Sequence, residues 1–122
     1  MTARIRRYIA EKAPATPCLI MDLDVVEQKY EELRRALPFA TIYYAMKANP
    51  APEILQLLSG LGSSFDAASI YEIRDVLMNG ASPERVSFGN TIKKKADIAA
   101  AYALGVRLFA FDSECELDKL AE

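Results

Sequence analysis

The sequence predicts an α/β fold: the first four strand–helix units of a (β/α)8 barrel. Short apolar segments alternate with helix-like segments, and the predicted strand ends at Lys47, Ser69, Asn90 and Ser113 follow one another at intervals of 22, 21 and 23 residues. So short a repeat requires parallel strands joined by helices. A complete barrel has eight units in roughly 250 residues, whereas this chain has 122 residues and stops in a helix. We therefore expect the remaining units to be missing.

The elements follow in a simple order. Residues 1–15 are polar and form a predicted N-terminal extension. "TPCLIMDLD" (16–24) predicts a short buried strand, and the helix after it is capped by Asp24 and stopped by Pro38; strand and helix together occupy 16–38. The partial barrel then takes 39–122. Its predicted strands are 39–47, 63–69, 84–90 and 106–113, and its predicted helices are 50–62, 70–81, 93–105 and 114–122.

The first turn of the barrel segment, "KANPAPE", contains no glycine. An open sheet that binds dinucleotides has a glycine-rich turn at this place, because the backbone must approach the phosphates closely. The barrel is therefore the better interpretation.

Composition excludes several kinds of function. The formal charge of −2 provides no basic surface for nucleic acid, and the single like-charge run, "KKK" at 93–95, is expected to be a solvated face. The chain has no histidine, so a histidine-ligated metal site and a Ser-His-Asp triad are impossible within it. Its two distant cysteines fit a reducing cytoplasm, and no segment resembles a signal peptide or a membrane span.

Lys47 ends the first predicted barrel strand, where barrel enzymes place their chemistry. Alternation puts Ile42, Tyr44 and Met46 on one face and Tyr43, Ala45 and Lys47 on the other. The bulky apolar face suits the surrounding helices, so Lys47 is expected to lean over the barrel mouth. Desolvation there would lower the pKa of its amine and make it a nucleophile. The alternative is an ordinary solvated lysine at a strand end.

Two carboxylates lie near the next strand end. Asp66 is expected to point into the barrel and to pair with Lys47, either as a structural ion pair or as a catalytic group. Glu72 stands three residues after Ser69, a capping-box spacing that explains it structurally and leaves a role at the site as the alternative. The same spacing recurs at Ser113 and Glu116. Asn90 either faces a ligand or caps the following helix.

Three blocks, "YYAMKANP", "LGSSFDAASIYEI" and "SPERVSFGNTIKKK", occur in this order. They resemble the pyridoxal-phosphate-dependent decarboxylases of basic amino acids, which have the alanine-racemase-like fold and include ornithine, diaminopimelate and arginine decarboxylases. The sequences of the three blocks are most similar to those of ornithine decarboxylases, and the resemblance covers the chain after residue 16. It implies that Lys47 attaches pyridoxal phosphate, that Asp66 and Glu72 lie near the cofactor, and that the strand over 16–24 belongs to a second, β-rich domain.

The resemblance also implies a cytoplasmic homodimer that converts ornithine to putrescine and carbon dioxide in polyamine biosynthesis. Family members are much longer, and their phosphate loop, ring-stacking histidine and C-terminal cysteine-aspartate segment have no counterpart here. We therefore expect the 122 residues alone to be inactive, with the residues that choose among ornithine, lysine, diaminopimelate and arginine lying beyond Glu122. Two alternatives are a single-barrel pyridoxal-phosphate homeostasis protein and a non-enzymatic half barrel that associates through its open edges.

Overall fold

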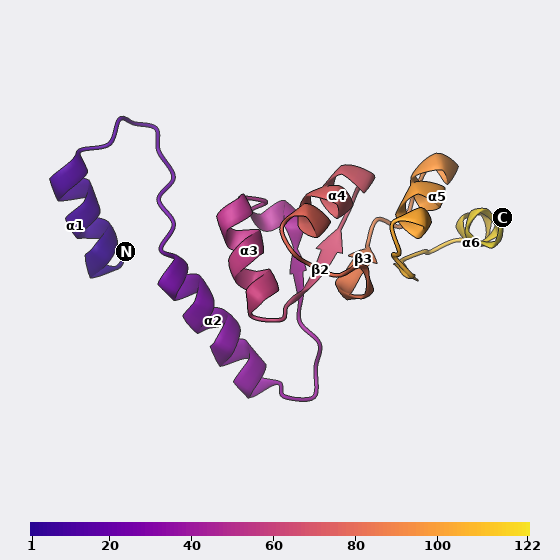
Figure 1. Cartoon of the computed structure of the whole chain (residues 1–122), viewed down its shortest axis with the longest axis horizontal. Helices are drawn as coiled ribbons and strands as arrows, with labels where there is room; N and C mark the ends of the chain where they lie inside the picture. Colours follow the sequence, from indigo (N-terminus) through magenta and orange to yellow (C-terminus); the bar gives the residue numbers. More distant parts are fainter.

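A computed structural model describes residues 1–122. Its centre is a four-stranded parallel sheet with the strand order β1-β2-β3-β4, so each strand pairs with its neighbour in the sequence. Helices connect the strands, while α1 lies near one end of the molecule and α6 at the other (Figure 1). The elements are α1 (Ala3–Lys12), α2 (Leu23–Ala36), β1 (Tyr43–Ala45), η1 (Met46–Ala48), α3 (Pro52–Gly60), β2 (Ser64–Ala67), α4 (Ile70–Met78), η2 (Pro83–Arg85), β3 (Val86–Phe88), α5 (Lys95–Ala103), β4 (Leu108–Phe109) and α6 (Glu114–Ala121).

This topology confirms the predicted succession of four strand–helix units. Parallel neighbours in sequence order are the arrangement of a (β/α)8 barrel, in which every strand is followed by a helix on the outside. The sheet has unpaired edges at β1 and β4.

The core lies between one face of the sheet and helices α3, α4 and α5. Phe65, Val86 and Phe88 point to this face, and Leu55 and Ile73 come to meet them from α3 and α4; all five are buried. The period-2 alternation of the strands and the helical spacing of the apolar residues direct these side chains to one layer. The other face carries a row of register partners, Ala45, Asp66, Ser87 and Leu108.

The strands are shorter than predicted, and the difference matters most at Lys47. β1 ends at Ala45, and Lys47 lies in the following 3-10 turn η1 instead of in the strand. Asn49 returns to an extended conformation, with φ −167° and ψ 109°. Proline disfavours a helical conformation in the residue before it, so Pro50 explains why this turn ends after Ala48.

The strand predicted over 16–24 is wrong, because residues 13–22 contain neither helix nor strand and Leu19 is 79% exposed. A strand needs a neighbour for its backbone hydrogen bonds, and none lies beside this segment. The predicted cap of α2 is also wrong, since α2 begins at Leu23 with Asp22 in the cap position.

The side chain of Asp22 does not cap α2, but contacts the N-terminal helix. The hydroxyl of Thr2 donates a hydrogen bond of 2.8 Å to Oδ2 of Asp22, and Arg4 lies 3.5 Å from Oδ1. Polar contacts thus attach α1, an element that the sequence did not predict, to the start of α2. None of the helices has both the length and the apolar character needed to cross a bilayer.

Candidate functional site

Lys47 is exposed, and it stands beyond the carboxyl end of β1. Its neighbour Met46 is fully buried in the core, so the backbone is anchored immediately before the lysine. None of the seven ion pairs in the structure includes Lys47. The amine is therefore available to a ligand at the end of the sheet where barrel enzymes bind their substrates.

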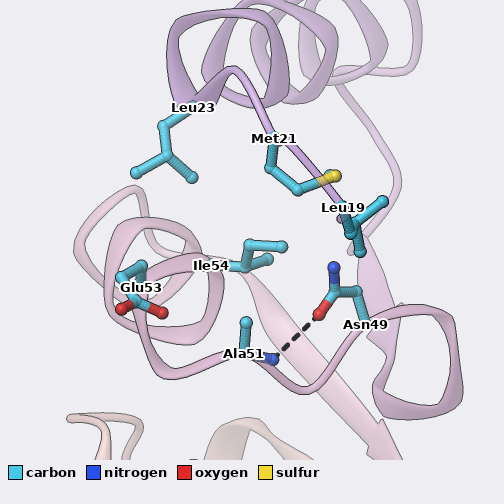
Figure 2. A pocket seen from close by; sticks show the side chains of 7 residues that line it. All are labelled: Leu19, Met21, Leu23, Asn49, Ala51, Glu53 and Ile54. Carbon is cyan, nitrogen blue, oxygen red and sulfur yellow. Dashed lines mark hydrogen bonds between the residues drawn. The ribbon is translucent and has the colours of Figure 1, made fainter. Parts of the chain in front are cut away.

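A hydrogen bond closes the turn that carries Lys47. The hydroxyl of Tyr44, in β1, donates to the carbonyl oxygen of Asn49 at 3.1 Å. The side-chain oxygen of Asn49 in turn accepts from the backbone N–H of Ala51 at 3.0 Å, as Figure 2 shows. Burial raises the pKa of Tyr44 above its ordinary value of 10.0, so the hydroxyl keeps its proton and can donate.

Asp66 lies in the row of residues that faces away from the helices, between its register partners Ala45 and Ser87. Its carboxylate lies against Gly89, just after β3, where a Cβ atom on the glycine would overlap it. The predicted ion pair with Lys47 does not form, because Ala45 is the residue that pairs with Asp66 while Lys47 has left the strand. Asp66 takes part in none of the seven ion pairs.

Glu72 forms the capping interaction that its spacing predicts. Its backbone N–H donates to Oγ of Ser69 at 3.2 Å, and its Oε2 accepts from the N–H of Ala68 at 2.7 Å. The carboxylate therefore lies at the loop after β2, close to the strand end. Asn90 makes only a local contact through its side chain, in which Oδ1 accepts from the N–H of Ile92 at 3.4 Å.

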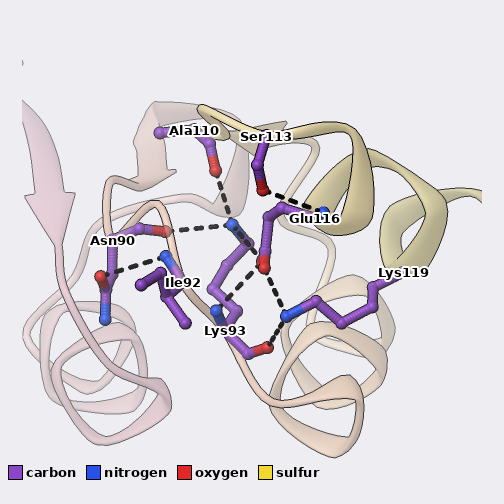
Figure 3. Close-up of polar contacts among 7 residues, drawn as sticks. All are labelled: Asn90, Ile92, Lys93, Ala110, Ser113, Glu116 and Lys119. Carbon is purple, nitrogen blue, oxygen red and sulfur yellow. Dashed lines mark hydrogen bonds and ion pairs between the residues drawn. The ribbon is translucent and has the colours of Figure 1, made fainter.

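A buried charge cluster joins the ends of β3 and β4 (Figure 3). The ammonium of Lys93 donates to the carbonyl oxygens of Asn90 at 3.0 Å and Ala110 at 2.5 Å, and lies 2.9 Å from Oε1 of Glu116. The side chains of Lys93 and Glu116 are 0% and 3% exposed. Lys119 pairs with the second oxygen of Glu116 and donates to the carbonyl of Lys93. Hydrogen bonds from Lys119 and then Lys93 lower the pKa of Glu116 to about 2.

This cluster corrects the interpretation of the "KKK" run as a solvated face. Lys94 and Lys95 are exposed, but Lys93 is buried. The capping bond from the N–H of Glu116 to Oγ of Ser113 was predicted and is present, at 3.3 Å. The carboxylate of Glu116, however, binds Lys93 and Lys119 and does not complete a capping box at the start of α6. Only the three-residue distance of Lys93 from the strand tip at Asn90 hinted at this arrangement.

Two shallow hollows lie beside the N-terminal part of the sheet. One, of about 310 Å³, is formed mainly by apolar side chains around the loop that follows Lys47; its lining is Leu19, Met21, Leu23, Asn49, Ala51, Glu53 and Ile54 (Figure 2). The other, of about 380 Å³, lies between α2, β1 and α3. Neither is lined by Lys47, Asp66 or Glu72.

The chain as a whole is similar to known proteins. The family described as "Pyridoxal-dependent decarboxylase, pyridoxal binding domain" matches residues 23–122. The lysine/ornithine decarboxylase of Selenomonas ruminantium is 45% identical over 116 residues, which are 95% of this chain and 29% of the relative. The chloroplastic ornithine decarboxylase of Nicotiana glauca is 42% identical over 85% of this chain and 24% of the relative.

Solved structures of amino-acid decarboxylases are also similar to this chain. Lysine decarboxylase from Selenomonas ruminantium superposes with a TM-score of 0.87 at 42% identity, covering 99% of this chain and 32% of that one, and it has also been solved with pyridoxal phosphate and cadaverine. The arginine decarboxylase of Paramecium bursaria Chlorella virus superposes with a TM-score of 0.88 at 30% identity, covering 98% of this chain and 32% of that one. The chain thus spans about a third, or less, of the length of these relatives. It belongs to the pyridoxal-dependent decarboxylase family, whose pyridoxal-binding domain matches all of the chain from α2 onward.

Proposed function

We propose that this chain contributes the cofactor lysine of a pyridoxal-phosphate-dependent decarboxylase that converts L-ornithine to putrescine and carbon dioxide. The observation that carries the proposal is the position of Lys47, which is exposed and free of ion pairs just beyond the carboxyl end of β1. An aldehyde cofactor requires a primary amine that is accessible and not held by a carboxylate. When bound, pyridoxal phosphate supplies a conjugated ring that takes up the electron pair left by departing carbon dioxide.

Two carboxylates at the end of the neighbouring strand β2 fit such a cofactor. Asp66 holds a carboxylate on the inner side of the sheet, and no cation of this chain neutralises it. It can therefore attract the positive charge of a basic substrate or a protonated group of the cofactor. Glu72 belongs to α4, but its carboxylate lies just after the same strand, where the bond from the N–H of Ala68 holds it in place. We assign Lys47 to covalent attachment, and Asp66 and Glu72 to the surroundings of the cofactor.

The choice of ornithine rests on the relatives. Their names include lysine/ornithine, ornithine and arginine decarboxylases, all of which act on basic amino acids. These names favour a decarboxylase over the alternative of a single-barrel homeostasis protein. A cytoplasmic homodimer as the working form of the full-length protein is a further part of the proposal; the two unpaired cysteines and the open edges of the sheet support it.

Reductive labelling tests the assignment of Lys47. Full-length protein is mixed with pyridoxal phosphate, treated with borohydride and digested, and the labelled peptide is identified by mass spectrometry. We expect the label on Lys47 and its loss in Lys47→Ala. Lys94→Ala is the matched control, because Lys94 is also exposed and free of ion pairs. A label that persists undiminished in Lys47→Ala would refute the proposal. Turnover of ornithine, lysine and arginine then identifies the substrate.

A further inference from the structure

We propose that Tyr44 is a positioning residue for Lys47, holding the turn that carries the reactive amine through its hydrogen bond to the carbonyl of Asn49. The inference rests on the proposed function of Lys47. It adds a residue that itself lies on the opposite, helix-facing side of β1 and need not touch the cofactor.

Packing orients the tyrosine. Its ring meets Phe65 of the neighbouring strand edge to face, with centroids 6.4 Å apart and an interplanar angle of 82°. The ring also packs against the buried core, while its hydroxyl reaches the carbonyl of Asn49 at 3.1 Å. Because edge-to-face contacts favour a defined ring orientation, the hydroxyl is held where it can bind this carbonyl.

The hydrogen bond between Tyr44 and Asn49 encloses the turn that contains Lys47. Tyr44 lies before η1 and Asn49 after it, so the bond encloses Met46–Ala48 and therefore Lys47. Within this segment Met46 is fully buried, which anchors the backbone before the lysine. Beyond it, the bond from the N–H of Ala51 to the side chain of Asn49 connects the turn to the start of α3.

Lys47 has no comparable restraint of its own. Its side chain takes part in no ion pair, and a lysine side chain is flexible. The backbone of the turn therefore fixes the point from which the amine projects. Reaction rates fall steeply when reacting groups are misplaced by about 1 Å, so loosening this turn is expected to slow the reaction of Lys47 with an aldehyde.

The test compares Tyr44→Phe with wild type in the full-length protein. Phenylalanine keeps the ring and its contact with Phe65 but removes the hydroxyl. Since one hydrogen bond contributes about 1 kcal/mol, we expect attachment of pyridoxal phosphate to Lys47 to slow by about 5-fold. Attachment is followed by the change in visible absorbance and by the amount of borohydride-trapped Lys47 against time. We also expect kcat to fall while KM stays near the wild-type value.

Two further variants make the result decisive. Tyr102→Phe is the matched control, because Tyr102 is 58% exposed on α5, away from the turn, and should leave attachment unchanged. Tyr44→Leu also removes the hydroxyl but keeps an apolar side chain against the core, so we expect it also to slow attachment. It decides the question if Tyr44→Phe does not fold.

The possible outcomes separate this inference from the proposed function. A folded Tyr44→Phe protein that attaches the cofactor to Lys47 at the wild-type rate overturns the positioning role and leaves the proposed function intact. If Tyr44→Phe does not fold, wild-type kinetics in a folded Tyr44→Leu protein have the same meaning. A label on another lysine in the wild type instead overturns the proposed function, and this inference with it.

Discussion

The carboxylate of Asp66 occupies the space that a Cβ atom would take on Gly89. Asp66 belongs to β2 and Gly89 directly follows β3, so the contact joins the ends of two neighbouring strands. The carboxylate is free of ion pairs, and the absence of a side chain at position 89 provides the room for its present orientation.

Gly89→Ala should destabilise the protein by about 1 kcal/mol, because the new methyl group forces the carboxylate of Asp66 out of its rotamer. In an Asp66→Ala background this conflict is absent. The same substitution should then be neutral or stabilise by about 0.4–1 kcal/mol, since alanine restricts the unfolded chain. Urea unfolding of the single and double variants measures both values. An equal effect of Gly89→Ala in the two backgrounds would show that the two residues do not interact.

Lys47→Ala should eliminate attachment of the cofactor and most activity of the full-length protein without a loss of stability. The lysine is exposed and unpaired, and substitutions at such positions usually change the free energy of unfolding by less than about 0.5 kcal/mol. Thermal unfolding of the two proteins without cofactor tests the stability, and the visible absorbance of attached cofactor tests the attachment. A large drop in the unfolding temperature would mean that Lys47 has a structural role.

Glu116→Gln should lower the unfolding temperature clearly more than Glu114→Gln. The first substitution leaves the buried ammonium of Lys93 without its counter-charge, and an uncompensated buried charge is strongly unfavourable. Glu114 lies on the same helix but is exposed, so it serves as the control. Equal melting curves for the two variants would contradict the structural importance of the cluster at the ends of β3 and β4.

The same cluster should make stability depend on pH. The pKa of Glu116 is about 2 in the folded protein against an ordinary value of 4.5. Between these pH values the unfolded chain binds the proton more readily than the folded protein. The contribution of Glu116 to the free energy of unfolding is therefore complete above pH 4.5 and declines as the pH falls toward 2. As the pH falls across that range, the unfolding temperature should decrease more steeply for wild type than for Glu116→Gln. Parallel curves would mean that Glu116 titrates normally.

The 122-residue chain by itself should associate and should not turn over ornithine. β1 and β4 are open edges of the sheet, and the face away from the helices exposes Tyr43 and Leu108. Unpaired edges and exposed apolar surface favour contact with another chain. Sedimentation over a range of concentrations and a putrescine assay measure the two properties. A monomer at high concentration, or measurable putrescine, would contradict the respective expectation.

Sequence patterns correctly predicted the features that depend on residues close together in the chain, namely the helix caps and the order of strands and helices. The serine and glutamate of each capping box are three residues apart, and both serines accept the predicted bond, from Glu72 and from Glu116. The repeat of about 22 residues likewise indicated the order of strands and helices. The sequence could not predict the structure of a segment that needs a partner distant in the chain. Residues 16–22 had strand-like composition, yet no neighbouring strand lies beside them.

By itself the sequence determined the parallel strand–helix repeat, the helix caps and the position of a lysine near the end of the first strand, because periodicity and capping act over a few residues. Only the tertiary structure decided that Lys47 leaves the strand and stands free of Asp66, and that Lys93 is buried against Glu116. Lys93 and Glu116 are 23 residues apart in the chain. Their side chains meet because parallel pairing brings the ends of β3 and β4 together, and a burial of that kind leaves no periodic signal in the sequence.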